Sequence, residues 1–382
     1  MSVSSSTPPF TPGNAWGPVR QELPWDKLTA FMVANKAALE NFQPPFVQAG
    51  QFGIGQSNPT FYLEDSRGNR YVLRRKPAGK LQHGAHQIDR EFRVQRAINQ
   101  QGYPSATMYL YCKDTSIVGT EFYIMKYLQG RVLGQMGIID LPPKDRRECF
   151  ESAVKTLALL HSYDHKAIGL TGYGKDSGFY DRSVRNWTRL SNQQAAVTDP
   201  KTGEKNWDLE GLNEQMEFFT KFMPADEVSI AHLDYMLHNV MFHPTENRIV
   251  AVLDWELSTI GHPLADLAYF TQPFFRAWPN GWIGAPASAL EGIPTVQEIL
   301  DMYAQYSGRK NKIERFEYHV AFSMYRSTVI AQGIAGRVLA GTATNEQAIR
   351  VKETLPATNM TCLKFIRETR ARWEAEGRAA KL

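Results

Sequence analysis

The sequence predicts a two-lobed α+β fold, with a small N-terminal lobe of antiparallel strands and a larger, mainly helical C-terminal lobe. At 382 residues, the chain exceeds the roughly 250–300 residues at which a single core stops growing. Short strand-like segments separated by turns occupy residues 46–127. Apolar residues recur at helical spacing in much of the chain after Gly130. The expected lobes are residues 23–128 and 129–370.

Both ends of the chain are expected to lie outside the lobes. Residues 1–14 are rich in Ser, Thr and Pro and lack an apolar segment or arginines, unlike a secretory signal or a mitochondrial presequence. We expect a disordered tail over residues 1–22 and a second tail over residues 371–382. The last three residues, Ala380-Lys381-Leu382, fit the small-basic-Leu pattern of peroxisomal targeting signals. They predict binding to the peroxisomal import receptor and a peroxisomal location, and otherwise a cytoplasmic one.

Composition argues against two classes of partner. Lysine and arginine total 43 against 39 acidic residues, for a net charge of +4, and the basic residues are scattered. Nucleic-acid binding requires a concentrated basic footprint, so no nucleic acid is expected. No apolar run approaches the length of a membrane span.

The three cysteines lie far apart without metal-ligand spacing, which favours a reducing compartment.

The small lobe is expected to form an antiparallel sheet with one helix. A glycine-containing turn follows Phe52, and alternating residues then predict strands near Phe61 and over residues 71–74. A helical pattern carries Glu91. Two apolar segments, Met108 to Cys112 and Phe122 to Tyr127, complete the sheet.

The large lobe is expected to be built from helices. Apolar spacing predicts them over residues 146–161, 214–222, 296–306, 314–333 and 357–376. Between Asp181 and Ser191, Arg182 and Arg185 recur on one side of a segment that also carries Trp187. Such an arginine face either receives a carboxylate or phosphate of a substrate or is simply solvated.

The segment from Ile230 to Phe270 carries the main chemical signal. It contains the motif H-x-D-x-x-x-x-N, with Asp234 and Asn239, and then Asp254 at the end of the β-branched run 249–253. Transfer of a phosphoryl group from ATP needs a carboxylate beside the accepting hydroxyl and ligands that hold magnesium on the phosphates. Asp234 would be the carboxylate, and Asn239 and Asp254 the metal ligands.

Each of these residues also has a structural interpretation. A single Asp near an Asn is most often turn chemistry, because both side chains bond to neighbouring backbone groups. The full ordered set of residues, with a strand before its last member, is far less expected by chance. His232 is expected to support the loop rather than to act as a base.

The segments HLDYMLHN and VLDWELSTIGHPLADLAY resemble the aminoglycoside phosphotransferase and choline kinase-like family, distant relatives of protein kinases. Together with GQSNPTF and YVLRRKP, they are most similar to the kinase-like domains fused to certain acyl-CoA dehydrogenases, over residues 25–366. Two positions differ from the family pattern. Leu233 stands where the family usually has Gly, and His262 stands where it favours Asp.

The resemblance implies a bilobal, protein kinase-like fold and assigns the nucleotide-binding residues. The turn containing Gly53, Gly55, Ser57 and Asn58 would cover the phosphates. Arg74 would hold the α- and β-phosphates and pair with Glu91, with Lys76 as the alternative cation. The backbone of Lys126 and Leu128 would bind adenine.

The sequence therefore predicts an ATP- and magnesium-dependent kinase that phosphorylates a hydroxyl of a small molecule. The resemblance to acyl-CoA dehydrogenase-fused domains suggests a 4-hydroxyacyl-CoA or a hydroxy fatty acid, so the acceptor would be CoA-linked or a free acid. The alternatives are an aminoglycoside- or choline-type kinase, and a nucleotide-binding pseudoenzyme that acts as a partner-binding module.

Overall fold

The computed structural model describes residues 16–53, 58–77, 87–134 and 137–377. They divide into two compact units. Unit 1 comprises residues up to Leu133 together with 166–171 and 238–258, and unit 2 comprises 134–165, 172–237 and 259–382. Among the described residues, no helix is long and apolar enough to cross a membrane. The predicted combination of an antiparallel sheet with a mainly helical region is confirmed.

Unit 1 is organised around a six-stranded antiparallel sheet with the strand order β1-β2-β3-β4-β6-β5. The strands are β1 (Trp16–Gly17), β2 (Phe46–Phe52), β3 (Thr60–Asp65), β4 (Arg70–Arg75), β5 (Met108–Cys112) and β6 (Phe122–Lys126). The helical elements of this part are α1 (Trp25–Ala34), the 3₁₀ helix η1 (Lys36–Ala38), α2 (Ile88–Asn99) and α3 (Thr115–Val118).

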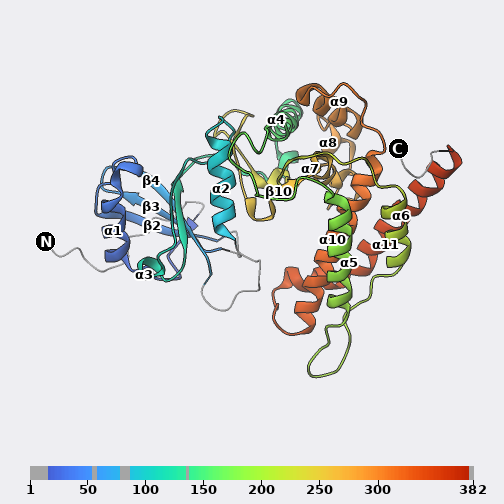
Figure 1. Ribbon diagram of the computed structural model, residues 1–382, viewed down its shortest axis with the longest axis horizontal. Helices are drawn as coiled ribbons and strands as arrows, with labels where there is room; N and C mark the ends of the chain where they lie inside the picture. The colour runs from blue at the N-terminus through green and yellow to red at the C-terminus, as the bar shows by residue number, and fades with distance from the viewer. Residues whose placement is uncertain (1–15, 54–57, 78–86, 135–136, 378–382) are drawn as a thin grey trace. The chain divides into compact units, whose positions relative to one another are not determined.

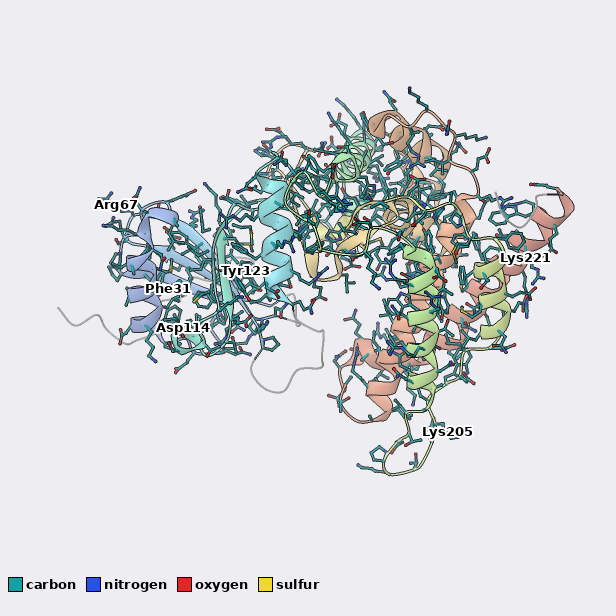
Figure 2. The ribbon with its side chains drawn as sticks, viewed as in Figure 1. Phe31, Arg67, Asp114, Tyr123, Lys205 and Lys221 are labelled. Atoms are coloured by element: carbon teal, nitrogen blue, oxygen red, sulfur yellow. The ribbon has the colours of Figure 1, made fainter. Side chains whose placement is uncertain are left out.

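The two faces of the sheet are covered by different helices (Figure 1). Buried side chains of α1 pack with Leu73 and Ile124 on one face. On the other face, Ile88 and Phe92 of α2 pack against Tyr123, which is labelled beside α2 in Figure 2. Side chains alternate between the faces along a strand. Arg74, next to Leu73, is therefore directed toward the α2 face.

The chain enters the fold earlier than predicted. Trp16, placed in the expected tail over residues 1–22, lies in β1, pairs with Phe52 and is 4% exposed. Its ring stacks on Tyr62, with centroids 4.4 Å apart. A Cβ atom on Gly50 would lie 2.1 Å from the Trp16 ring, so this packing depends on glycine. Burial of a large aromatic surface outweighs the polar composition of the residues before it.

The predicted linear boundary at residue 128 is also incomplete. Strands β8 (Val240–Phe242) and β9 (Ile249–Val252) form a hairpin that belongs to unit 1. Arg131 and Phe242 exchange backbone hydrogen bonds of 2.8 Å, and the Val252 N–H donates to the Pro104 carbonyl at 3.0 Å. These contacts join segments more than a hundred positions apart, so a division based on consecutive residues does not reveal them.

Unit 2 is mainly helical, and α10 packs against α5, α7 and α11. Its helices are α4 (Pro143–Ser162), α5 (Phe179–Ala195), α6 (Leu212–Lys221), α7 (Pro263–Phe270), α8 (Ala287–Leu290), α9 (Val296–Ser307), α10 (Phe316–Leu339) and α11 (Glu346–Ala375), with 3₁₀ helices η2 (Gly137–Asp140) and η5 (Gln272–Phe275). Strands β7 (Ser229–Ala231) and β10 (Thr259–Gly261) form a two-stranded antiparallel sheet. The 3₁₀ helix η3 (Leu237–Asn239) contains the division between the units, and η4 (Trp255–Leu257) lies in unit 1.

Helix α11 begins earlier than predicted, and it includes residues that were assigned to the C-terminal tail. It begins at Glu346, whereas the sequence predicted a start after Pro356. A proline within a helix costs about 3 kcal/mol, but Leu355 beside it is 1% exposed and α11 packs along α10. The helix also continues through Trp373, which is fully buried. Residues 371–375 are therefore part of the fold and not of a tail, while Ala380-Lys381-Leu382 lies outside the described residues.

Candidate active site

Arg74 forms ion pairs with two carboxylates of unit 1. On β4 it stands opposite Tyr123 of β6, on the face that α2 covers. Its Nε atom lies 2.9 Å from Oε2 of Glu91, in the first turn of α2. Its Nη2 atom lies 3.7 Å from Oδ1 of Asp254. Strand periodicity and one helix turn thus bring the predicted cation and its predicted partner together.

The Arg74–Glu91 pair is well shielded from water, with side-chain exposures of 13% and 2%. Burial opposes the charge on Arg74, but Tyr123 and the carboxylates of Glu91 and Asp254 raise its pKa above the usual value. Burial also raises the pKa of Glu91, and Arg74 opposes that rise. Glu91 accepts further hydrogen bonds from the Tyr123 hydroxyl at 3.1 Å and the Asn58 amide at 3.0 Å.

Arg75 and Lys76, the other two cations at the end of β4, have different surroundings from Arg74. Lys76, the alternative phosphate cation, places Nζ 2.8 Å from Glu121. Arg75 points to the opposite face, as its position predicted, and donates to the Val118 carbonyl at 2.7 Å. Arg74 is therefore the one of the three that contacts Glu91.

The predicted phosphate-covering turn is described in part. Gly55 and Ser57 lie outside the described residues, whereas Gly53 follows β2 and Asn58 precedes β3. Asn58 is fully buried, and its amide donates to Glu91. A buried amide needs partners inside the protein. The structure thus gives Asn58 a supporting contact with α2, and its predicted role beside the phosphates stays a prediction.

A cavity of about 510 Å³ lies beside Arg74 in unit 1. Apolar residues form much of its wall, and its lining also includes Lys126 and Leu128, the residues predicted to bind adenine. The Lys126 N–H donates to the Thr107 carbonyl at 2.9 Å, so this N–H is already occupied by the protein. An apolar slot with a few polar groups is typical of small-molecule sites.

Asn239 and Asp254 line the same cavity from adjoining positions of the β8–β9 hairpin. The Leu253 N–H donates to the Asn239 carbonyl at 2.8 Å, which fixes Asn239 beside the residue before Asp254. Oδ1 of Asp254 is buried and accepts no hydrogen bond from the residues that the structure describes. Carboxylate and amide oxygens are the ligands that magnesium prefers. These two residues therefore fit a magnesium ion.

Asp234 lies in unit 2, on the loop after β7. The carboxylate of Asp266 on α7 holds this loop by accepting the backbone N–H groups of His232 at 2.7 Å and Leu233 at 2.6 Å. Asp266 is fully buried, and its Oδ2 also lies 3.1 Å from Nε2 of His161. The structure thus gives Asp266 a structural role, as the buried acceptor for the backbone of this loop.

His232 supports the loop, as expected. Its side chain is fully buried, and its Nδ1 accepts the Asp234 N–H at 3.2 Å. His262, which replaces the family's usual Asp, caps α7 because its Nδ1 accepts the Leu264 N–H at 3.2 Å. A neutral imidazole therefore takes over the capping function of a carboxylate.

Tyr269 is a contact of Asp234 that the sequence analysis missed. Its hydroxyl hydrogen-bonds to the Asp234 carboxylate, and burial together with that negative charge raises the pKa of Tyr269 to about 12. Tyr269 follows Asp266 by three positions on α7, so the two side chains share a helix face. This spacing from Asp266 was the available sequence signal.

The two arginines proposed for the acceptor have different outcomes. Arg185 is exposed and forms a 2.6 Å ion pair with Asp181, one turn away. Trp187 lies two residues after Arg185, about 200° further around the helix, and therefore on a different face. Its ring contacts Arg326. Arg182 is partly buried beside Gly178 at the start of α5. Sequence periodicity indicated an arginine face but not Arg326, which comes from α10.

Comparison with known proteins gives the family of the chain. Residues 49–299 match the model of the phosphotransferase enzyme family. The human acyl-CoA dehydrogenase family member 11 is 38% identical over 324 residues, which cover 84% of this chain and 40% of that protein. The chain thus spans about two fifths of the length of this curated relative.

Solved structures agree with the fold. A protein of Ralstonia eutropha assigned to the aminoglycoside phosphotransferases is 34% identical, with a TM-score of 0.78 over 91% of this chain and 99% of that one. The ethanolamine kinase of Plasmodium vivax, at 15% identity and a TM-score of 0.61 over 88% of each chain, shares the fold alone. From its sequence match and its kinase-like fold, the chain belongs to the phosphotransferase enzyme family.

Proposed function

We propose that this protein transfers the γ-phosphoryl group of MgATP to a hydroxyl of a small hydroxylated acyl compound. The observation that carries the proposal is the position of Arg74 between Glu91 and Asp254, beside a cavity that Asn239 also lines. A buried cation, two oxygen ligands and an apolar slot are the components that a bound nucleoside triphosphate requires.

In the proposed reaction, the acceptor oxygen forms a bond to the γ-phosphorus while the bond to the ADP oxygen breaks. Asp234 orients the accepting hydroxyl and takes its proton, and Arg74 binds the phosphate oxygens. Magnesium, held by Asn239 and Asp254, would neutralise charge on the transferred group. Asp266 positions Asp234 by binding the loop backbone at Leu233. Tyr269 positions it through a hydrogen bond to the Asp234 carboxylate. The products are a phosphate ester, ADP and one proton.

The acyl part of the proposal is supported by relatives whose names are those of acyl-CoA dehydrogenases. A 4-hydroxyacyl-CoA or a free 4-hydroxy acid is the proposed acceptor. Phosphorylation of its hydroxyl would turn a poor leaving group into a good one and so prepare the acyl chain for further breakdown.

The test is consumption of MgATP with a panel of acceptors: 4-hydroxypentanoyl-CoA, 4-hydroxypentanoate, choline and an aminoglycoside. Mass spectrometry would detect the phosphate ester. We expect transfer to a hydroxyacyl compound, its loss in Asp234→Asn and Asp254→Asn, and full activity in Asp301→Asn, which changes an exposed aspartate of α9.

Three other outcomes would replace the proposal. Transfer to choline or the aminoglycoside alone would establish the corresponding kinase class. ATP binding without transfer to any acceptor would favour a nucleotide-binding module. Unchanged transfer in Asp234→Asn would show that this carboxylate does not act on the acceptor.

We further propose that the protein is imported into peroxisomes. The support is the sequence Ala380-Lys381-Leu382 alone. A fluorescent reporter ending in residues 371–382 should become punctate and colocalise with a peroxisomal marker. Deletion of Leu382 should make it diffuse, and an unchanged distribution would contradict the proposal.

A further inference from the structure

Arg326 is a buried arginine whose surroundings in unit 2 are aromatic. It lies on α10 and is 5% exposed. Its Cζ atom lies 5.1 Å from the ring centroid of Tyr269 and 5.9 Å from that of Trp187. Within the described ranges of the chain, Arg326 makes no side-chain hydrogen bond and no ion pair. Its faces are therefore occupied, while the N–H donors at its edge have no acceptor.

The guanidinium group of Arg326 lacks the anionic partner that a buried arginine usually has. Arginines are rarely buried unless they are paired with an anion, because loss of hydration costs more than stacking on aromatic rings returns. The guanidinium carries five N–H donors in a planar fork that matches a carboxylate or a phosphate. Aromatic rings leave this fork unsatisfied, so it remains available to an anionic ligand.

A second arginine acts on the same tyrosine. Arg276 directly follows η5 and is partly buried. Burial lowers its pKa, while the proximity of Tyr269 raises it. Arg276 likewise forms no ion pair with any residue that the structure describes. Arg326 thus stacks on the Tyr269 ring, and Arg276 interacts electrostatically with the same residue.

The phenol ring connects these arginines to the loop of Asp234, because the Tyr269 hydroxyl hydrogen-bonds to the Asp234 carboxylate. The local geometry is fixed: Gln272, just after α7, donates to Ser323 at 2.8 Å and to Ser327 at 3.0 Å on the α10 segment that carries Arg326. Asp234 and the buried Asp266 are the carboxylates of this region, and within the described residues neither Arg326 nor Arg276 forms an ion pair with them. The charges of both guanidinium groups are therefore available to an anionic ligand.

We propose that Arg326 and Arg276 form an anion-binding subsite beside Asp234 that recognises a carboxylate or phosphate of the acceptor. This inference rests on the proposed function, since it assumes that Asp234 faces the acceptor hydroxyl. It adds the two residues that would recognise the negative charge of this acceptor, and it excludes cationic acceptors by charge repulsion.

The experiment measures binding by calorimetry without ATP, so that it does not depend on phosphoryl transfer. The probes are 4-hydroxypentanoate, its neutral analogue 4-hydroxypentanamide, and 4-hydroxypentanoyl-CoA. We expect the wild-type protein to bind an anionic probe at least about tenfold more tightly than the amide, as charge-assisted hydrogen bonds imply. Arg326→Gln and Arg276→Gln should each remove most of that preference, while Arg326→Lys should keep part of it.

The control is Arg350→Gln, which removes an exposed positive charge of α11 that pairs with Glu346. It should bind all three probes as the wild type does. Thermal unfolding identifies any variant that fails to fold, and Arg276→Gln tests the subsite independently of the more deeply buried Arg326.

The probes separate the two sources of negative charge. A loss confined to 4-hydroxypentanoate would assign the subsite to a carboxylate, and a loss confined to the thioester would assign it to a CoA phosphate. Equal wild-type affinity for the acid and the amide, with thioester binding unchanged in both Gln variants, would overturn the subsite even if the protein is an active kinase. Selective anion binding without phosphoryl transfer to any acceptor would leave the subsite standing and refute the proposed function.

Discussion

The Asp266 carboxylate accepts the backbone N–H of Leu233 at 2.6 Å, and Leu233 adopts a φ of 61°. The hydrogen bond and the left-handed backbone belong together, because the turn that presents this N–H to Asp266 also shapes the loop before Asp234. Glycine adopts a positive φ without the steric cost that a Cβ atom imposes. A glycine would therefore adopt this conformation at a lower cost than Leu233 does.

Leu233→Gly is expected to be at least as stable as Leu233→Ala. At an ordinary position glycine is less stable than alanine by about 0.5–1 kcal/mol, but the left-handed conformation costs a residue with a Cβ about 1–2 kcal/mol. Urea unfolding of the two variants measures the order. A glycine variant that is clearly the less stable would show that Leu233 carries no backbone strain.

Asp266→Asn is expected to destabilise the protein by about 1–3 kcal/mol, because an amide has one acceptor oxygen where the carboxylate has two and leaves a buried N–H unsatisfied. Phosphoryl transfer should fall as well, since the loop that carries Asp234 loses its support. Denaturant titration and steady-state kinetics give both quantities. The exposed substitution Asp301→Asn is the matched control, and equal behaviour of the two variants would contradict the role of Asp266.

Arg74→Gln should weaken ATP binding and destabilise the protein by about 3 kcal/mol, since removal of Arg74 leaves the buried Glu91 carboxylate without its ion-pair partner. Lys76→Gln, which loses a partly exposed pair with Glu121, should change stability by less than about 1 kcal/mol. Calorimetric titration with MgATP compares the two. A larger loss of ATP affinity in Lys76→Gln would identify Lys76 as the phosphate cation.

Stability should fall as the pH is lowered from about 6.5 toward 4. Burial lowers the pKa of His262 to about 4 from its usual 6.5, despite the nearby Glu227 carboxylate, and burial and the neighbouring His262 also lower the pKa of His319. The unfolded chain therefore binds more protons than the folded one in this range. The contribution of the two neutral histidines to the free energy of unfolding is fully present above pH 6.5 and is lost as the pH falls toward 4.

Urea unfolding between pH 4.5 and 7.5 measures this dependence, whose slope is about 1.4 kcal/mol per pH unit for each proton. His262→Asn keeps an acceptor for the Leu264 N–H. It should reduce the slope by up to the amount that corresponds to one proton, about 1.4 kcal/mol per pH unit. An identical slope in this variant would mean that His262 is not the titrating group.

Local sequence features were sufficient for several parts of the fold and the site. The family resemblance predicted that Arg74 pairs with Glu91, and the structure shows this ion pair. Strand alternation supports it, because it separates Arg74 from Arg75 by face. Asn239 and Asp254 are joined by one short hairpin. The tail boundaries were wrong at Trp16 and Trp373, because burial of these rings depends on surfaces distant in sequence.

The sequence by itself predicted the strands and the main helices, because these depend on short-range periodicity, and its motifs with their family resemblance supplied the candidate residues from Arg74 to Asp254. Only the tertiary structure decided that the β8–β9 hairpin belongs with the sheet, that Asn58 supports Glu91, and that Arg326 and Tyr269 come together near Asp234. Helices α7 and α10 are separated by more than forty residues along the chain. Contacts between such elements depend on how their faces pack, which no local pattern specifies.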